Sequence, residues 1–373
     1  MRYAPIPFES FTRLLTQMPV IAQIDPLALL ALPADTKIVR NDDEARTLLD
    51  SPEYVSCHPM VIAEDNSKLT EQFPAYEVLG LPEVNQLNRS LSTRLDIARQ
   101  LLLTNHAVTD RIVNEVAHYK PAVTVVLLID GLSYQDAKDW GWPIVPCFVD
   151  SPSVTYRYHD AENTQVIRTI GFAALLGTPH LSQRLLQLGF RHFRGFSYWQ
   201  RGQNRISDTL FERIAVQQVQ GFSTVLNLLA ETPTAAGTYI QIVREGLDGL
   251  AHGKRELSHV EIQGALKAIY QDIEALTALL HAQKLPSRIY VTADHGMLWK
   301  HEHSLELLNI KGSKPRYTKG DIPDHLKHYA TSLQGYSVLH YPYLGAAINA
   351  NDSGVHGGLS YQESIVPFIT IEV

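Results

Sequence analysis

Residues 123–130 read VTVVLLID, a continuous run of β-branched and aliphatic side chains that ends in an aspartate. Such a run is typical of a strand covered on both faces, as in a parallel sheet. Two further strands are predicted downstream, TYIQIV at 238–243 and RIYVTA at 288–293, with a long helical pattern between them. This alternation predicts an α/β fold with a mainly parallel central sheet flanked by helices.

The helical pattern between the two later strands begins with a capping box. Ser258 precedes Glu261 by three positions, and apolar side chains then recur every three or four residues from Ile262 to Leu280. This spacing predicts one amphipathic helix that crosses over from one strand to the next.

Four short motifs carry the acidic and histidine side chains of greatest interest: IDGLSY at 129–134, LDGLAH at 247–252, TADHG at 292–296 and GVHGG at 354–358. They supply three aspartates and three histidines: Asp130, Asp248, His252, Asp294, His295 and His356. Parallel strands deliver the residues that follow them to one edge of the sheet, so we expect these side chains to converge. Six such ligands suffice for two divalent cations, which together clamp a phosphoryl group.

Each motif also has an ordinary structural explanation. An aspartate before a glycine, as at Asp130 and Asp248, is typical of a turn, and His356 between Val355 and Gly357 fits a loop. The adjacent acid and imidazole of TADHG give the strongest single indication, because neither is expected to be buried without a partner. The shared position at strand ends favours the metal site. Other histidines, in the KHEH run and after Asp321 and Asp324, are predicted to be solvated: His301, His303, His325 and His328.

Composition restricts the class of protein. The chain has 373 residues and is 45% hydrophobic, and its 32 basic and 39 acidic residues give a net charge of -7. This balance provides no overall electrostatic footprint for nucleic acid. Cys57 and Cys147, the only cysteines, fit a reducing compartment, and MRYAPIPFESF at the start lacks the apolar core of a signal peptide. We therefore expect a cytoplasmic protein that does not enter the membrane.

The first part of the chain carries none of the four motifs and is repeatedly interrupted by proline. We interpret residues 1–118 as a mostly helical accessory region and residues 119–373 as the catalytic domain. Within the accessory region, Leu91, Leu95, Ala98 and Leu102 share one face of a predicted helix that runs from Ser90 to about Val116.

A candidate nucleophile lies in DSPSVTYRYHDAENTQVIRTIGF, which begins at Asp150. VTYRYHD and TQVIRTI both alternate in polarity, which predicts a β-hairpin with AEN between its strands. The segment offers four hydroxyl side chains, any of which ordinary strand propensity also explains: Ser153, Thr155, Thr164 and Thr169.

The motifs IDGLSY, PSVT, LDGLAH, TADHG and GVHGG, in this order and followed by LSYQESIVPFI, resemble the alkaline phosphatase superfamily. Within it they are most similar to the PglZ-domain proteins of bacterial phage-defence (BREX) systems. The resemblance covers residues 120–373. It implies an alkaline phosphatase-like fold, with one metal held by Asp130, Thr155, Asp294 and His295 and a second held by Asp248, His252 and His356.

The resemblance also implies that Thr155 is the nucleophile. The small-residue run GFAALLG at 171–177 comes later than in the family, so Thr169 is an alternative. Neither Cys147 nor Ser153 is followed by the C/S-x-P-x-R pattern of sulfatases, which argues against sulfatase activity.

The resulting hypothesis is a phosphohydrolase with two divalent cations, zinc ahead of manganese, that acts on a phosphate ester, and on diesters rather than monoesters. Other defence-system proteins are its expected partners. One alternative is a non-catalytic, metal-binding component of a multiprotein defence complex. Another is a nuclease, for which six arginines near the nucleophile segment would form a cationic path: Arg157, Arg168, Arg191, Arg194, Arg201 and Arg205. The overall acidity argues against nucleic acid as a partner.

Overall fold

The computed structural model describes residues 27, 30, 36–39, 58–61, 83–150, 155–159, 165–198, 210–212, 214–232, 234–252, 257–301 and 304–373. The chain divides into two compact units, 1–101 and 102–373. The predicted catalytic domain from residue 119 stays a prediction, because the division of the chain by packing does not report on activity.

The described residues of the first unit include the short parallel strands β1 (Thr36–Val39) and β2 (His58–Val61), and the helices α5 (Val84–Thr93) and α6 (Leu95–Leu101). Leu87, Leu91 and Ala98 are buried on the helices. Most of the predicted accessory region before Glu83 lies outside the described residues.

The prediction of a single helix from Ser90 to Val116 is wrong. The hydroxyl of Thr93 donates a hydrogen bond to the Arg89 carbonyl at 2.9 Å, and Arg94 leaves the helical region at φ -130°. Side-chain bonds of this kind compete with the backbone ladder and favour helix ends. The chain continues as α6, a two-residue strand β3 (Leu103–Thr104), a 3-10 turn η2 (Asn105–Ala107) and α7 (Val108–Tyr119).

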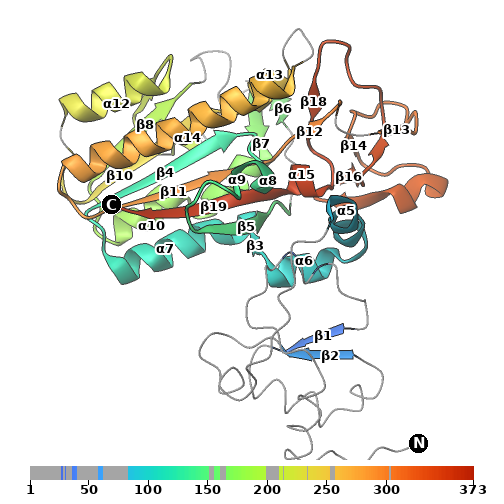
Figure 1. Ribbon diagram of the computed structural model, residues 1–373, viewed down its shortest axis with the longest axis horizontal. Coiled ribbons are helices and arrows are strands. Elements are labelled where there is room, and N and C mark those ends of the chain that lie inside the picture. Colours follow the sequence, from blue (N-terminus) through green and yellow to red (C-terminus); the bar gives the residue numbers. More distant parts are fainter. Residues whose placement is uncertain are drawn as a thin grey trace, which may run out of the picture. The chain divides into compact units, whose positions relative to one another are not determined.

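The second unit is built on an eight-stranded sheet with the order β3-β5-β19-β11-β4-β10-β8-β9 (Figure 1). Its strands beyond β3 are β4 (Val123–Asp130), β5 (Ile144–Phe148), β8 (His192–Ser197), β9 (Val216–Gln218), β10 (Thr238–Glu245), β11 (Ser287–Ala293) and β19 (Ile365–Glu372). Within this sheet β19 is antiparallel to both its neighbours, and the other pairings are parallel. The predicted α/β fold with a mainly parallel sheet is confirmed.

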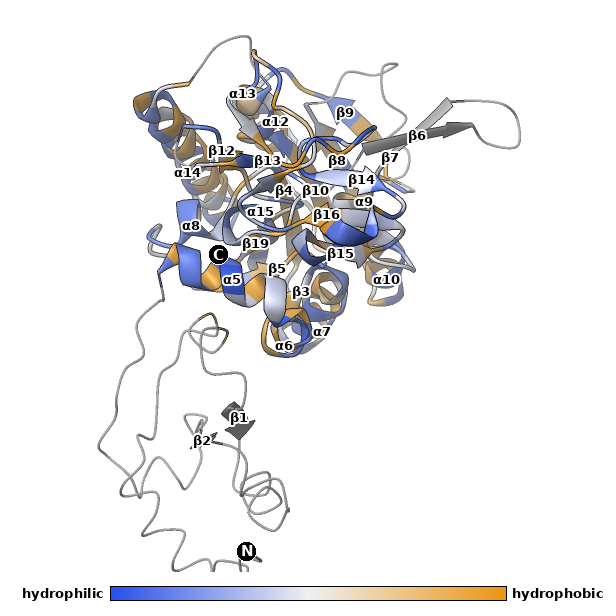
Figure 2. Cartoon of the chain, turned by 90° about the vertical axis from the view of Figure 1, so that its right-hand side faces the viewer, coloured by the Kyte–Doolittle hydropathy of each residue, from blue (hydrophilic) through white to orange (hydrophobic). Residues whose placement is uncertain are grey.

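Helices cover both faces of this sheet (Figure 1). The long helix α14 (His259–Ala282) and α12 (Phe222–Glu231) lie on one face, and α7 and α10 (Leu181–Gln187) lie on the other. Both apolar and polar residues recur along α14 and α7 in Figure 2, as expected of helices with one buried side. None of the described helices combines the length and the hydropathy of a membrane span.

The central strands are buried from end to end because helices cover them on both sides. Every residue of β4 from Val123 to Ile129 is buried, and all of β11 is buried. The apolar run that predicted the fold is therefore the middle of the core. The predicted crossover helix is α14, and Ser258 caps it with both hydrogen bonds of the capping box to Glu261.

Two segments leave the sheet near its carboxyl edge. Residues 298–355 contain β12 (Leu298–Trp299), β13 (Glu306–Leu307), β14 (Tyr317–Lys319), η3 (Asp324–Tyr329), β15 (Ala330–Leu333), β16 (Tyr336–Leu339), β17 (Tyr343–Leu344) and β18 (Gly354–Val355). The antiparallel pair β6 (Thr155–His159) and β7 (Gln165–Thr169) confirms the predicted hairpin. The remaining short helices are α8 (Tyr134–Ala137), α9 (Ile170–Leu176), α13 (Asp248–Ala251) and α15 (Tyr361–Ser364).

Candidate metal centre

Three neighbouring parallel strands place the three aspartates at one edge of the sheet. Asp130 is the last residue of β4, Asp294 directly follows β11, and Asp248 begins α13 just after β10. The register pairs Asp130 with Glu245 and Ile129 with Ala293, so the three strands end at the same level. The structure thus brings together the residues that the sequence places at strand ends.

Two glycines allow the chain to pass close to these aspartates. Gly131 has φ +79°, and a Cβ there would lie 3.0 Å from the backbone nitrogen of Asp248 and 3.4 Å from Cε1 of His295. A Cβ at Gly246 would collide with the carbonyl of Asp130. Only glycine fits these positions, since the loops after β4 and β10 touch.

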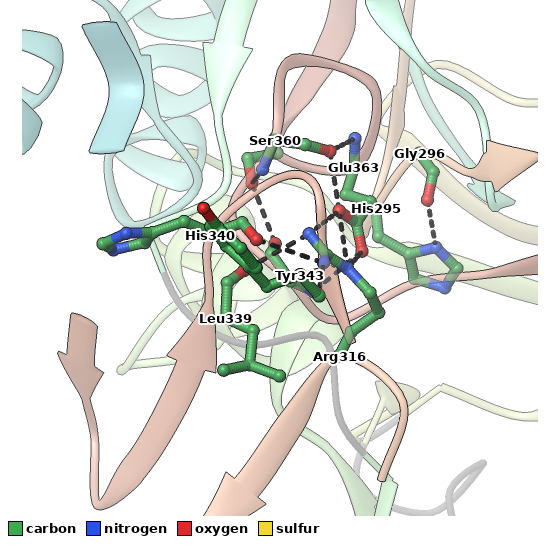
Figure 3. Close-up of polar contacts among 10 residues, drawn as sticks. His295, Gly296, Arg316, Leu339, His340, Tyr343, Ser360 and Glu363 are labelled. Carbon is green, nitrogen blue, oxygen red and sulfur yellow. Dashed lines mark hydrogen bonds and ion pairs between the residues drawn. The ribbon is translucent and has the colours of Figure 1, made fainter. Parts of the chain in front are cut away.

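The first group of candidate ligands consists of Asp130, Asp294 and His295, whose ligand atoms all lie within 4.8 Å of one another. Nε2 of His295 is 3.6 Å from Oδ1 of Asp130 and 3.6 Å from Oδ2 of Asp294. Nδ1 of His295 lies 3.0 Å from the Gly296 carbonyl, which orients Nε2 toward the carboxylates (Figure 3). Burial alone would lower the pKa of His295, but the charges of Asp294 and Asp130 raise it to about 10.

The second group consists of Asp248, His252 and His356. Nε2 of His252 and Nε2 of His356 each lie 3.3 Å from the same oxygen, Oδ1 of Asp248. This oxygen is buried and forms no hydrogen bond with any described residue. Ligands about 2.0–2.1 Å from a tetrahedral zinc ion lie roughly 3.3 Å from each other, so the spacing matches that of a zinc site.

Electrostatics in the second group favour an ionised Asp248 beside a neutral His356. Burial by itself would raise the pKa of Asp248, but His252, His356 and His295 lower it strongly. Burial and the charge of His295 lower the pKa of His356 to about 4. A neutral imidazole and an ionised carboxylate are the forms that bind metal.

The two groups adjoin each other. The rings of His295 and His356 stack with centroids 3.9 Å apart and planes 7° from parallel. The six acids and histidines among the predicted ligands are thus brought into one site. Their role as ligands stays a proposal.

A buried ion pair supports the loop that carries His356. Arg316 is fully buried, and its Nε and Nη2 donate to Glu363 at 2.9 and 2.7 Å (Figure 3). Glu363 also accepts hydrogen bonds from the Gly358 backbone nitrogen at 2.9 Å and from the Ser360 hydroxyl at 2.6 Å. Arg316 further donates to the carbonyls of Leu339 and Tyr343. The pair therefore joins residues 339–343 to the loop after His356.

Sequence reasoning missed both members of this pair. Ser360 and Glu363 do carry the spacing of a capping box, and Ser360 does cap α15. Nothing local in the sequence around Arg316 indicates that its partner is Glu363.

The predicted nucleophile occupies the first position of the hairpin. Thr155 and the alternative Thr169 are directly paired across β6 and β7. The side chains of these strands lie outside the described part of the structure, as do residues 152–154 of the PSVT motif. The choice between the two threonines stays a prediction.

The other histidines lie away from the two groups. His301, His325 and His328 are exposed, and Asp324 pairs with Lys327 at 2.7 Å, while His303 lies outside the described residues. Among the described residues, none of these histidines belongs to a group that could hold a metal ion.

The proposed cationic path does not form from the arginines that can be assessed. Arg191 directly precedes β8, so it lies at the amino end of this strand and not at the carboxyl end, where the ligand groups gather. Its side chain donates hydrogen bonds to the Leu186 and Phe190 carbonyls. Arg194 bonds the Leu228 and Thr232 carbonyls. Arg201 and Arg205, and the side chains of Arg157 and Arg168, lie outside the described residues.

Comparison with known proteins gives similar solved structures only. No family model matches the chain, and no curated protein sequence matches it. Murine ectonucleotide pyrophosphatase/phosphodiesterase 5 is 12% identical, with a TM-score of 0.42, over 66% of this chain and 87% of that one. The periplasmic domain of phosphoethanolamine transferase EptC from Campylobacter jejuni is 12% identical, with a TM-score of 0.35, over 68% of this chain and 79% of that one.

The periplasmic domain of EptC from Escherichia coli, in its complex with zinc, is 14% identical with a TM-score of 0.32. The alignment covers 48% of this chain and 64% of that domain. These similarities concern the fold alone and assign no activity to this chain.

Proposed function

We propose that the chain is a phosphohydrolase that binds two divalent cations and uses a threonine nucleophile. The observation that carries the proposal is the contact between the two ligand groups, which meet where His295 stacks on His356. Two cations held by these adjoining groups would act on one phosphoryl group.

The residues present fit such a pair of cations. Asp130, Asp294 and His295 would hold one, and Asp248, His252 and His356 would hold the other. Asp248 Oδ1 and His356 Nδ1 are buried without a hydrogen bond from any described residue, which is costly unless something else binds there. Mixed imidazole and carboxylate ligands suit zinc, and manganese accepts them as well.

The chemistry requires few groups beyond these. When bound, the cations would lower the pKa of a nearby hydroxyl and stabilise negative charge on the phosphoryl oxygens. The Thr155 Oγ1–phosphorus bond would form as the bond to the leaving oxygen breaks, and water would then hydrolyse the phosphothreonine. Thr169, directly opposite in the hairpin, is the alternative nucleophile.

The charge of the site favours a phosphodiester. Two divalent cations and three carboxylates leave about one net positive charge, which a diester monoanion neutralises and a monoester dianion exceeds.

The proposal is tested by hydrolysis of bis-p-nitrophenyl phosphate and p-nitrophenyl phosphate after the purified protein has been stripped of metal. We expect zinc or manganese to restore activity, with the diester preferred, and Asp294→Ala to abolish it. Zinc uptake without hydrolysis of either ester would instead favour the non-catalytic alternative. The role in phage defence that the sequence resemblance implies stays a prediction.

A further inference from the structure

His252 lies between two carboxylates. Its Nε2 is 3.3 Å from Oδ1 of Asp248, the oxygen that also faces His356. Its other ring nitrogen, Nδ1, is 3.5 Å from Oδ1 of Asp352. The ring therefore presents one nitrogen to the proposed ligand group and the other to an acid that none of the four sequence motifs contains.

Asp352 belongs to a turn that is held in place by its own hydrogen bonds. Nδ2 of Asn349 donates to Oδ2 of Asp352 at 2.8 Å, and the Asp352 backbone nitrogen donates to the Asn349 carbonyl at 3.1 Å. These bonds leave Oδ1 as the oxygen that faces His252. Only 14% of the Asp352 side chain is exposed, so water screens this carboxylate incompletely.

The same turn is fastened to the segment that carries His252. The backbone nitrogen of Ser353 donates to the Ala251 carbonyl at 2.8 Å, and the hydroxyl of Ser353 accepts from the Leu257 backbone nitrogen at 3.1 Å. One loop thus delivers both His356 and Asp352 to the second ligand group.

The two carboxylates make opposite demands on the single proton of a neutral imidazole. Asp248 favours the proton on Nε2, and Asp352 favours it on Nδ1. A cation at the second ligand group needs the lone pair of Nε2, so only the Nδ1–H form can bind it. A carboxylate beside the other ring nitrogen of a metal-binding histidine fixes that tautomer and the ring orientation.

We propose that Asp352 is a positioning residue for His252, which it holds in the Nδ1–H tautomer with Nε2 directed at the second cation. The inference rests on the proposed metal site and deepens it. Asp352 touches neither substrate nor cation, so its contribution is to the affinity and occupancy of one of the two sites.

The test is zinc binding to the metal-free full-length protein, measured by competition with a chromophoric chelator. We expect Asp352→Ala to lower the affinity for one of the two zinc ions by about 10- to 100-fold and to leave the affinity for the other unchanged. Asp352→Asn should lie between, because the amide oxygen still accepts from Nδ1–H but carries no charge. Asp321→Ala, which removes an exposed acid outside both ligand groups, is the matched control and should bind as the wild type does.

A second measurement separates positioning from a general loss of structure. Ring nitrogen NMR of the zinc-loaded protein, with His252 assigned by His252→Gln, should show its proton on Nδ1 in the wild type and in Asp352→Asn. A proton on Nε2 would overturn the proposal even if the alanine variant fails to fold. Two zinc ions bound by Asp352→Ala as tightly as by Asp321→Ala would overturn it while leaving the proposed function intact. A wild-type protein that takes up no zinc would overturn both.

Discussion

His295 stacks on His356 with ring centroids 3.9 Å apart, although the two residues follow different strands. Nε2 of His295 lies 3.6 Å from Oδ2 of Asp294, and Nε2 of His356 lies 3.3 Å from Oδ1 of Asp248. The pKa of His295 is raised to about 10 by its carboxylates, and that of His356 is lowered to about 4 by burial and by His295, so within the stacked pair the positive charge is favoured on His295.

Removal of one acid should empty one ligand group. Asp294 is 1% exposed and serves only the group with Asp130 and His295. We expect Asp294→Ala to bind about one zinc ion per chain where the wild type binds two, and to lose phosphodiesterase activity by at least about 10³-fold. Elemental analysis after dialysis gives the stoichiometry. Unchanged zinc content in Asp294→Ala would exclude this aspartate as a ligand.

The nucleophile can be identified by separate replacement of the two paired threonines. Thr155→Ala should reduce turnover by at least about 10³-fold while both cations stay bound, because the attacking oxygen is lost but six ligands remain. Thr169→Ala serves as the matched control, since the two residues are partners in one hairpin. Steady-state hydrolysis and intact-mass detection of a phosphorylated chain measure the effect. If the alanine at 169 stops turnover and the alanine at 155 does not, the assignment is reversed.

Replacement of only one member of the Arg316–Glu363 pair should strongly destabilise the protein. Both side chains are 1% exposed or less, so Arg316→Met leaves a buried carboxylate without its cation. We expect a loss of about 3–5 kcal/mol in the free energy of unfolding. The double variant Arg316→Met with Glu363→Gln should lose less, because no charge is then left unpaired.

Urea unfolding measures this effect against a surface pair. Lys327 and Asp324 pair at 2.7 Å with side chains that are 58% and 92% exposed, so Lys327→Met should cost less than about 1 kcal/mol. Equal losses for Arg316→Met and Lys327→Met would show that the buried pair does not support the loop of His356.

The sequence predicted the sheet and the convergence of the three aspartates because both depend on local pattern. The run at 123–129 needs cover on two faces, and Asp130, Asp248 and Asp294 directly follow or closely trail strands. In a parallel sheet, that local fact is enough to bring them together. The hairpin β6–β7 was predicted for the same reason, from alternation within a short segment.

The residues that sequence reasoning missed depend on distant contacts. Asp352 faces His252 only because Ser353 bonds Ala251, and Arg316 meets Glu363 only because residues 298–355 fold back toward the sheet. Neither contact has a periodicity or a spacing that a single sequence reveals. The helix predicted from Ser90 failed differently, because hydroxyl side chains near its start, on Ser92 and Thr93, bond the preceding turn.

Stability should decline in mild acid partly because of His340. Burial, with the charge of Arg316, lowers the pKa of His340 from 6.5 to about 4, and its Nε2 lies 2.8 Å from the Thr331 hydroxyl. Between pH 6.5 and 4 the unfolded chain therefore binds a proton at His340 that the folded chain does not bind. The stability that the neutral His340 contributes is complete above pH 6.5 and is lost as the pH falls toward 4. Because the ring is only partly buried, we expect this loss to be roughly 1–3 kcal/mol. Urea unfolding from pH 7 to pH 4.5 should show a shallower decline for His340→Gln than for the wild type, whereas His325→Gln, at an exposed position, should follow the wild type. Parallel curves for His340→Gln and the wild type would mean that the folded protein protonates His340 as readily as the unfolded chain does.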